Sequence, residues 1–423
     1  MTAEAHHLAA DFVIAGANFT GMTAALALSH TLGPEYRIAI VDRREPTAAL
    51  DDPRCFALSA GSRRLLDALG VWKRLAEATQ DVVEIIITDS ALDAAVRPVV
   101  LRYDNILDTG EAAASIVPGG ALLSALHGAC VETPSIRLAG GFEIAGWRTD
   151  AGIAEVSAAD GRVVKAQLAL AADGRKSRLA ALSGIKTIET AHGQTGLVAV
   201  VRHSKPHNGA AVQHFLPDGP FALLPLPGNR CCVTWSETTS SAQRILGLDD
   251  ARFLEEIVRR AGGRLGELSL EGRRASWPLS TQIARDFTGP RLALLGDAAH
   301  GVHPIAGQGL NLAFRDIATL AEDIAETARA GLDLGSDTAL ESYAQRRRFD
   351  ATSSAGVFDA INRLFSNDNT ILRSVRDAGM GLVDRMPGLK RMLVAEAAGL
   401  TGTVPQLMRP PAPPAHRPAE VQS

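Results

Sequence analysis

The sequence has few cysteines and no spacing that is typical of a metal site. Its four cysteines are Cys55, Cys130 and the adjacent pair Cys231 and Cys232. None of them forms a C-x-x-C spacing, so we expect neither a metal site nor a disulfide framework. A small set of reduced thiols is typical of a reducing compartment, which favours a cytoplasmic location.

The sequence also lacks features of membrane-spanning, secreted and nucleic-acid-binding proteins. No apolar run reaches the roughly 18–20 residues of a membrane-spanning helix. The N-terminal stretch MTAEAHHLAAD has no basic segment followed by an apolar one, so we expect no secretory signal. The net charge of −4 and the isoelectric point near 6.3 argue against a nucleic-acid partner.

The N-terminal region has the outline of a dinucleotide-binding βαβ unit. The apolar run Phe12–Ala15 predicts a buried strand that ends at Gly16, and residues 20–33 predict a helix that begins near Gly21. A second apolar run ends at Asp42, about where an acidic residue accepts hydrogen bonds from an adenosine ribose. The pattern predicts a parallel sheet with a nucleotide-binding turn at its carboxyl edge.

One residue of this turn departs from the G-x-G-x-x-G pattern, because Asn18 stands where the middle glycine belongs. That glycine has no Cβ, which lets the backbone approach a pyrophosphate. Asparagine is among the few other residues that tolerate a positive φ, and its amide could donate to a phosphate oxygen. Taken alone, the remaining glycines fit a nucleotide-binding turn and an ordinary strand-to-helix turn equally well.

Two later strand ends support the nucleotide interpretation. The run Leu168–Ala171 leads into Asp173 and Gly174, although an Asp-Gly pair after a strand is also a common turn. The run Leu292–Leu295 leads into GDAAHGVHPIAGQGLNLAF, in which Asp297 follows the strand and a long helix begins after a loop. Free N–H groups at the start of that helix favour a negative charge or a polarised carbonyl. We therefore expect three strand ends to meet at one extended ligand.

Four segments together resemble the class A flavoprotein monooxygenases, whose fold is that of p-hydroxybenzoate hydroxylase. These segments are GANFTG, DPRCFALSAGSRRLLDALGVW, AADGRKS and GDAAHGVHPIAGQGLN. The segment GPFALLPLPGNRCCVTW and the LFSND stretch at 364–368 are similar to the UbiH/VisC-type hydroxylases of ubiquinone biosynthesis. The resemblance implies an α/β fold: a Rossmann-like FAD-binding domain with a parallel sheet, interleaved with a mixed or antiparallel substrate domain, and a C-terminal helical segment.

The resemblance implies a set of FAD-binding residues. Gly16, Asn18 and Gly21 match the diphosphate turn, and Asp42 matches the acid that binds the adenosine ribose. Arg54 matches an arginine near the flavin and its diphosphate. The other matches are Asp173 and Gly174 of the Asp-Gly motif, the ribityl-binding Asp297, and Pro304, Gly307, Gly309, Leu310 and Asn311 beside the isoalloxazine ring.

Three positions depart from the family pattern. Asn18 replaces glycine, and Ala180 stands where an arginine often follows the Asp-Gly motif. Gly119 and Gly120 replace an Asn-Arg-like pair on a helix that faces the flavin in relatives. The loss of that cationic side chain puts FAD affinity or the electron-donor step in question, but not the fold.

The resemblance also implies the chemistry. Reduced FAD reacts with O2 to give a C4a-hydroperoxide, which transfers one oxygen atom to an electron-rich phenol, here a polyprenyl phenol. NAD(P)H or another donor supplies the electrons. No protein nucleophile is needed, so we name no catalytic residue. His207, His300 and His303 are expected to be structural, with a role in handling protons as the alternative.

The 423 residues, 46% of them hydrophobic, are enough for two or three domains. The segment GPFALLPLPG predicts a strand with an apolar face. This face either forms the floor of the substrate site or belongs to the hydrophobic core of the sheet. The expected division is a discontinuous FAD-binding domain at 8–75, 112–182 and 275–335, a substrate domain at 80–105 and 185–275, C-terminal helices at 338–400, and a disordered Pro-rich tail at 404–423.

The region 361–393 combines apolar residues at helical spacing with a surplus of basic residues. Such a helix can lie on an anionic membrane, here on its cytoplasmic face, and a water-insoluble polyprenyl substrate favours this interpretation. The alternative is an apolar face packed on the body of the protein, with the charged face in solvent.

Three functions remain open at this point. The leading one is an FAD-dependent aromatic-ring hydroxylase of ubiquinone biosynthesis. The second is a flavoenzyme of the same fold that acts on a small soluble aromatic compound or reduces an isoprenoid chain. The third is a flavin-poor partner in a quinone-synthesis complex, which rests only on Asn18, Gly119 and Gly120. The colour of the purified protein separates the third from the others.

Overall fold

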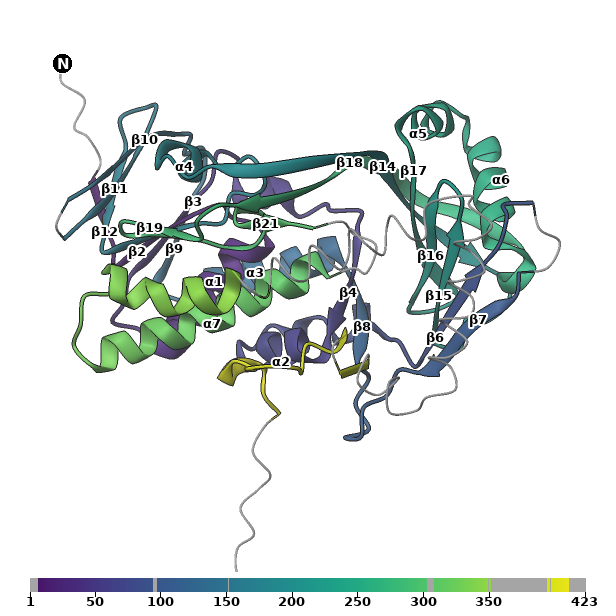
Figure 1. Ribbon diagram of the computed structural model, residues 1–423, viewed down its shortest axis with the longest axis horizontal. Helices are drawn as coiled ribbons and strands as arrows, with labels where there is room; N and C mark the ends of the chain where they lie inside the picture. Colours follow the sequence, from purple (N-terminus) through teal and green to yellow (C-terminus); the bar gives the residue numbers. More distant parts are fainter. Residues whose placement is uncertain are drawn as a thin grey trace, which may run out of the picture.

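The computed structural model describes residues 7–93, 97–150, 152–302, 308–348, 350, 394–395 and 397–410. The molecule is elongated, with a helix-covered parallel sheet at one end and a large, mostly antiparallel sheet at the other (Figure 1). Two long strands, β14 (Thr187–His203) and β18 (Leu268–Ala284), run between the two ends. This architecture confirms the fold class expected from the sequence.

The first sheet has six strands in the order β19-β20-β13-β2-β3-β9, and only the edge strand β19 is antiparallel. The four central strands are fully buried, as short apolar runs in a parallel sheet should be. The bounds are β2 (Phe12–Ala15), β3 (Ile38–Val41), β9 (Ile136–Ala139), β13 (Leu168–Ala171), β19 (Thr288–Gly289) and β20 (Leu292–Leu294).

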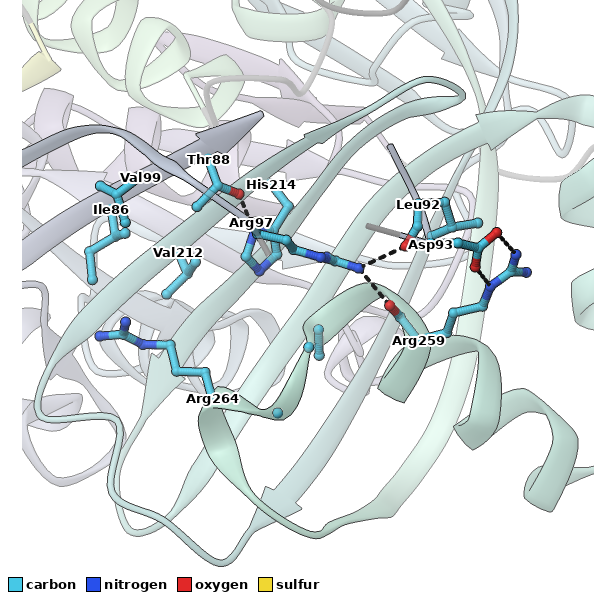
Figure 2. A pocket seen from close by; sticks show the side chains of 13 residues that line it. Ile86, Thr88, Leu92, Asp93, Arg97, Val99, Val212, His214, Arg259 and Arg264 are labelled. Atoms are coloured by element: carbon cyan, nitrogen blue, oxygen red, sulfur yellow. Dashed lines mark hydrogen bonds and ion pairs between the residues drawn. The ribbon is translucent and has the colours of Figure 1, made fainter. Parts of the chain in front are cut away.

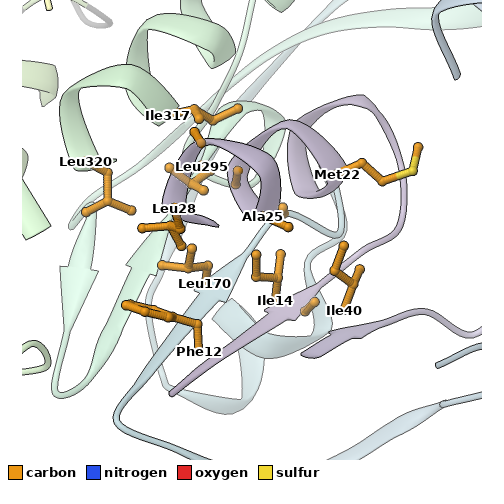
Figure 3. Close-up of a cluster of buried hydrophobic side chains, with 14 of the residues drawn as sticks. Phe12, Ile14, Met22, Ala25, Leu28, Ile40, Leu170, Leu295, Ile317 and Leu320 are labelled. Carbon is orange, nitrogen blue, oxygen red and sulfur yellow. The ribbon is translucent and has the colours of Figure 1, made fainter. Parts of the chain in front are cut away.

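Three helices cover this sheet: α1 (Phe19–Leu32), α3 (Gly119–Val131) and α7 (Gly309–Arg329). Small and apolar residues make up most of α1, so its backbone can approach the strands closely. Gly33 ends α1 at a φ of +101°, and its N–H donates to the Ser29 carbonyl, as expected for a C-cap glycine. Figure 3 shows the core that joins α1, the strands and α7 through residues such as Ile14, Leu28, Leu170 and Ile317.

Two smaller sheets flank the first one. The four-stranded sheet has the order β1-β12-β11-β10, and the three-stranded sheet has the order β4-β8-β5. Their bounds are β1 (His7–Ala9), β4 (Cys55–Ser59), β5 (Gln80–Asp81), β8 (Ala114–Pro118), β10 (Ile144–Thr149), β11 (Ala154–Ala158) and β12 (Val163–Ala166). Short helices nearby are η1 (Pro46–Ala49), α2 (Ala60–Ala68), η2 (Trp72–Arg74), η3 (Ala76–Ala78), α4 (Arg178–Leu182) and η5 (Gly296–Ala298).

The large sheet has eight strands in the order β21-β18-β14-β17-β16-β15-β6-β7. The helices α5 (Thr239–Leu246) and α6 (Asp250–Ala261) and the short η4 (Gly263–Leu265) pack on one face. The predicted domain boundary at residue 275 falls inside β18, so this strand passes through both predicted units. The remaining bounds are β6 (Glu84–Asp89), β7 (Val99–Asp104), β15 (Ala210–Leu216), β16 (Gly219–Leu226), β17 (Arg230–Thr238) and β21 (His300–Gly301).

The expected disorder of the tail is wrong for its first residues. Residues 404–410 are placed, Gln406–Met408 form the short helix η7, and the Met408 side chain is only 1% exposed. Met408 and Leu407 belong to the main hydrophobic core, so burial of apolar surface holds this segment despite its prolines. Residues 411–423 lie outside the described residues. Of the expected C-terminal helices, 337–348 is helical and 351–393 lies outside the described residues.

Candidate functional site

The three strand ends predicted to converge do lie at one edge of the parallel sheet. Ala15 of β2 is in register with Val41 of β3 on one side and with Ala171 of β13 on the other. Ala171 is in turn in register with Leu294 of β20. All four strands run in the same direction, so the segments that follow them emerge side by side. Ligands bind at this carboxyl edge in open α/β sheets.

The turn after β2 is packed so tightly that only glycine fits at its two glycine positions. Gly16 has a φ of +106°, and a Cβ there would lie 2.4 Å from the Ala172 carbonyl oxygen. A Cβ on Gly21 would lie 1.8 Å from the Gly16 carbonyl oxygen. The turn thus brings bare backbone to the sheet edge, which is what close approach to a pyrophosphate requires.

Asn18 does not adopt the positive φ that the sequence comparison with glycine suggested. Its φ is −123° and its ψ is −168°, so its backbone is extended and free of left-handed strain. Asn18 is the N-cap of α1, and its side-chain Oδ1 accepts a hydrogen bond of 2.7 Å from the Phe19 N–H. Asparagine is a favoured N-cap residue, which gives a structural reason for its presence here.

Asp42 lies directly beside this turn. Its Oδ2 accepts a hydrogen bond of 2.8 Å from the Ala17 N–H, and its Oδ1 accepts one of 2.8 Å from the Arg44 N–H. A carboxylate has about four lone-pair sites, so these two bonds leave capacity for further donors such as ribose hydroxyls. The acid predicted at the end of the second strand is therefore next to the turn and held in a fixed orientation.

Asp297 lies at the same edge, in η5 after β20. Its side chain is exposed, and it makes no hydrogen bond within the described part of the chain. Gly296 before it has a φ of +55°, and a Cβ there would lie 2.9 Å from the Cβ of Ala313 and 3.1 Å from Oγ1 of Thr20. Gly296 therefore packs between α1 and α7 and presents Asp297 at the edge.

The start of α7 borders this edge as well. Gly309 is its first residue, and a Cβ there would only touch Cγ2 of Val302 at 3.7 Å. Leu310 is buried in the main core. Pro304 and Gly307, which were also predicted to lie beside the flavin, are outside the described residues, as is His303.

Asn311 joins α7 to the neighbouring strand and helix. Its Oδ1 accepts hydrogen bonds from the Ser59 N–H at 2.9 Å and from the Ser62 hydroxyl at 2.7 Å. Its Nδ2 donates to the Ala57 carbonyl at 2.9 Å. These bonds give the predicted Asn311 a positioning role, because they fix α7 against β4 and α2.

Asp173 and Gly174 form a turn that leads into α4. The Asp173 Oδ2 accepts from the Arg178 N–H at 2.7 Å, and Gly174 has a φ of +85°. The other oxygen, Oδ1, is buried without a hydrogen bond, and burial raises the pKa of this carboxyl. The next residue, Arg175, donates through Nη2 to the Ser280 carbonyl at 2.6 Å and so ties this loop to β18.

Arg54 lies between the parallel sheet and the large sheet. Its guanidinium is 5.8 Å from the ring centre of Phe19, the first residue of α1, and 6.0 Å from that of Trp277 in β18. Its Nε donates to Asp52 Oδ1 at 2.9 Å and its Nη2 lies 2.5 Å from Asp52 Oδ2. This neighbour partly neutralises Arg54, a feature that the sequence motif did not reveal.

The replacement of an Asn-Arg-like pair by Gly119 and Gly120 has a packing reason. The Gly119 N–H donates to the Arg54 carbonyl at 2.7 Å, and the Gly120 N–H donates to the Asp52 carbonyl at 3.1 Å. A Cβ on Gly120 would lie 2.9 Å from the Leu50 carbonyl oxygen. The loop that carries Arg54 thus lies directly on the start of α3, where a larger side chain would not fit.

A buried ionic cluster behind the edge was missed by sequence reasoning. His300 Nε2 lies 2.6 Å from Asp316 Oδ2, and Arg347 Nε donates to Asp316 Oδ1 at 2.8 Å. The Gly296 N–H also donates to Asp316 Oδ2, at 3.0 Å. The cluster therefore fixes the strand end that carries Asp297. The GDAAH, FRD and QRRR sequences contain His300, Asp316 and Arg347, but only the fold shows that they meet.

The contacts of His300 and His207 are consistent with the expected structural role. His300 is fully buried in that cluster. The Nδ1 of His207 accepts from the Gly209 N–H at 2.9 Å, which makes its Nε2 the donor to the Leu226 carbonyl at 2.9 Å. His207 therefore joins the loop before β15 to the end of β16.

An apolar cluster lies between the large sheet and the three-stranded sheet. It joins residues of β14, β16 and β17 to β8, and Trp277 and the side chains of β4 pack against it. Trp277 of this cluster lies 6.0 Å from the Arg54 guanidinium, so the cluster borders the space next to Arg54. Its buried members are Val82, Ile116, Val198, Leu226 and Cys232.

The observed edge fits an extended dinucleotide such as FAD. The turn at Gly16 and Gly21 has no room for side chains, two carboxylates line the edge at Asp42 and Asp297, and a helix of 21 residues begins there. This geometry agrees with the FAD-binding edge expected of a class A flavoprotein monooxygenase.

The comparisons with known proteins agree. The chain belongs to the FAD binding domain family, whose model matches residues 9–354. It is similar to the ubiquinone hydroxylase UbiL of Rhodospirillum rubrum, with 36% identity over 95% of this chain and 92% of the relative. It is also similar to the 3-demethoxyubiquinol 3-hydroxylase of Escherichia coli, with 29% identity over 92% of this chain and 98% of the relative. The resemblance to ubiquinone-biosynthesis hydroxylases is thereby confirmed.

Solved structures show the same fold. The crystal structure of p-nitrophenol 4-monooxygenase PnpA from Pseudomonas putida DLL-E4 matches with a TM-score of 0.75. The match covers 94% of this chain and 99% of that chain, at 15% sequence identity. In the described part of this chain, no helix is both long enough and apolar enough to span a membrane.

Proposed function

We propose that this protein is the FAD-dependent hydroxylase of a ubiquinone-biosynthesis step and inserts one oxygen atom from O2 into the ring of a polyprenyl phenol. The observation that carries the proposal is the edge where the ends of β2, β3, β13 and β20 meet opposite the apolar face of the large sheet. The similarity to ubiquinone hydroxylases supports the substrate class.

The residues at the edge have separate binding roles in this proposal. The turn with Gly16, Asn18 and Gly21 holds the FAD diphosphate, and Asp42 accepts hydrogen bonds from the adenosine ribose. Asp297 binds the ribityl chain. The N–H groups at the start of α7 stabilise negative charge on the flavin ring, together with the stretch that includes Pro304, Gly307, Gly309, Leu310 and Asn311.

When bound, FAD supplies the activation of O2 and the transfer of oxygen to the ring. Arg54 positions the flavin side of the site, and its own position is held by Asp52 and the aromatic rings around it. The apolar cluster that includes Val198 and Cys232 excludes water and accommodates the apolar ring of the substrate. The turn at Asp173 and Gly174 contributes to binding FAD and the electron donor NAD(P)H.

The insoluble substrate must be collected from a membrane or a protein partner. We propose that the basic region 361–393 makes peripheral contact with the cytoplasmic face of an anionic membrane, within or beside a quinone-synthesis complex. This region lies outside the described residues, so the proposal rests on its sequence pattern.

The function is tested with the purified full-length protein. A yellow preparation with bound FAD, reduced by NADH or NADPH and exposed to isotopically labelled O2, should add one labelled oxygen atom to a short-chain polyprenyl phenol, as measured by mass spectrometry. A colourless protein that does not take up FAD would instead indicate a non-catalytic partner. Turnover of small soluble phenols only would indicate the second alternative, and accumulation of a quinone precursor in a deletion strain checks the pathway.

A further inference from the structure

A cavity of about 380 Å³ lies on the large sheet, on the face that carries α6. It is formed by β6, β7 and β15, by the C-terminal end of α6 and by the segment after it (Figure 2). Ile86 of β6 and Val212 of β15 point into it, whereas their neighbours Ile85 and Ala211 pack against the apolar cluster on the opposite face. The sheet therefore separates this cavity from the proposed flavin site.

The cavity has more positive than negative charge. Asp93 and Arg259 neutralise each other through two hydrogen bonds of 2.7 Å. Within the residues that the structure describes, Arg97 donates to the backbone carbonyls of Leu92, Arg259 and Arg260 and to no carboxylate. Arg264 makes no hydrogen bond or ion pair within the described part of the chain. Among the described residues, neither of these two guanidinium groups has a bonded counter-ion.

His214 adds a buried donor that points toward the same space. The residue is only 5% exposed, its Nδ1 is hydrogen-bonded to the Thr88 hydroxyl, and its Nε2 is buried without a hydrogen bond. Burial and the nearby Arg97 lower the pKa of His214 to about 4, and the Ala261 backbone carbonyl only partly offsets this. In the tautomer in which Nδ1 accepts from the Thr88 hydroxyl, Nε2 carries the proton, and it lies at the lining of this cavity near the Ala261 carbonyl.

The rest of the lining is apolar, with Ile86, Leu92, Val99 and Val212 around the charged groups. A small inorganic anion would leave these side chains without a partner, and a neutral lipid would leave the arginines without one. We propose that the cavity is a binding site for an amphiphilic anion, in which Arg264, Arg97 and the His214 Nε2–H receive a phosphate or carboxylate head and the apolar wall receives a short aliphatic chain.

The test uses the full-length protein with FAD bound and isothermal titration calorimetry. Octyl phosphate is the probe, and octanol and inorganic phosphate are the comparison compounds that lack the head or the chain. We expect one saturable site for octyl phosphate and clearly weaker binding of both comparison compounds. Arg264→Gln should weaken octyl phosphate binding by about tenfold, since a hydrogen bond to a charged group is lost.

Arg264 is exposed and has no bonded partner among the described residues, so its replacement should not disturb folding. Arg252→Gln is the matched control, because Arg252 is an exposed arginine of α6 that pairs with Asp249 outside the cavity. Its affinity for octyl phosphate should equal that of the wild type. Equal binding by Arg264→Gln and the wild type, equal binding of octanol and octyl phosphate, or no saturable binding would each overturn the proposal.

A second measurement locates the ligand. In protein with labelled histidine, the His214 ring signals, assigned with His214→Gln, should move on addition of octyl phosphate, and the visible flavin spectrum should stay unchanged. Octyl phosphate could instead enter the proposed substrate space beside the flavin. In that case the flavin spectrum would change while the His214 signals stayed in place, and the assignment to this cavity would be wrong. Neither readout depends on hydroxylase activity.

Discussion

The carboxylate of Asp42 holds the Ala17 N–H at 2.8 Å, and this bond joins the end of β3 to the turn that follows β2. Asp42→Ala should therefore lower FAD affinity in two ways, by removing a ribose acceptor and by loosening the turn. The loss should be at least about tenfold, the equivalent of one hydrogen bond to a charged group. Fluorescence titration of the apoprotein with FAD measures it.

Asp11 supplies a matched control for this experiment. Its Oδ2 accepts the Arg37 N–H at 2.8 Å, so it makes the same kind of bond at the opposite, amino end of the same two strands. Asp11→Ala should lower stability without changing the FAD affinity of the folded protein. Equal effects of the two variants on FAD affinity would show that Asp42 has no specific role at the cofactor.

Asp297→Ala should lose flavin because the exposed carboxylate after β20 is the proposed partner of the ribityl chain. The expected cost is about 1–3 kcal/mol of binding free energy, measured as FAD retained after gel filtration and as a dissociation constant. Asp286→Ala is the control, because Asp286 is also exposed but precedes the β19–β20 hairpin. Full flavin occupancy in Asp297→Ala would remove this residue from the site.

Asn18→Gly should leave FAD affinity unchanged and lower the stability of α1 by only a few tenths of a kcal/mol, because glycine is nearly as good an N-cap. Asn18→Ala should cost about 1 kcal/mol in unfolding free energy, because the bond to the Phe19 N–H is lost. Thermal unfolding and FAD titration measure the two quantities. A marked loss of FAD affinity in Asn18→Gly would instead assign a phosphate contact to the side-chain amide.

The buried cluster around Asp316 should make stability depend on pH. Burial raises the pKa of Asp316, but His300 and Arg347 outweigh it and leave the pKa below its usual value. The ionised carboxylate therefore stabilises the folded state above the unfolded pKa of about 3.9, and this contribution is lost as pH falls through the folded pKa. Asp316→Asn should destabilise the protein by about 3–5 kcal/mol at pH 7 and by progressively less below pH 4.

Chemical denaturation at several pH values checks this prediction. Glu326→Gln is the control, since Glu326 is an exposed carboxylate on the same helix and should have little effect at any pH. A difference between wild type and Asp316→Asn that did not change with pH would mean that volume or shape, and not charge, is responsible.

Reversal of Arg373, Arg376 and Lys390 to Glu should reduce binding to anionic vesicles, and more so at low salt, while flavin content stays normal. Vesicle sedimentation across a salt series measures this. Reversal of the exposed Arg137, Arg148 and Arg329 changes the net charge equally and should have a smaller effect. If the wild-type protein does not bind anionic vesicles even at low salt, delivery of the substrate by a protein partner becomes the better explanation.

The sequence by itself determined the parallel sheet, the tight turn and the order of the strand ends. Short apolar runs that end in glycine or aspartate have few other solutions, so the strands at Phe12–Ala15 and Leu168–Ala171 match their predicted bounds. The C-cap at Gly33 was equally local, because a positive φ and a following proline specify it.

Only the tertiary structure decided which distant residues meet. It joined His300 to Asp316 and Arg347, and it placed the loop that carries Arg54 over Gly119 and Gly120. It also brought Arg97, His214 and Arg264 around one cavity. Sequence periodicity reports which face of an element is apolar, but not which other element covers it, and that pairing is set by packing across the whole chain.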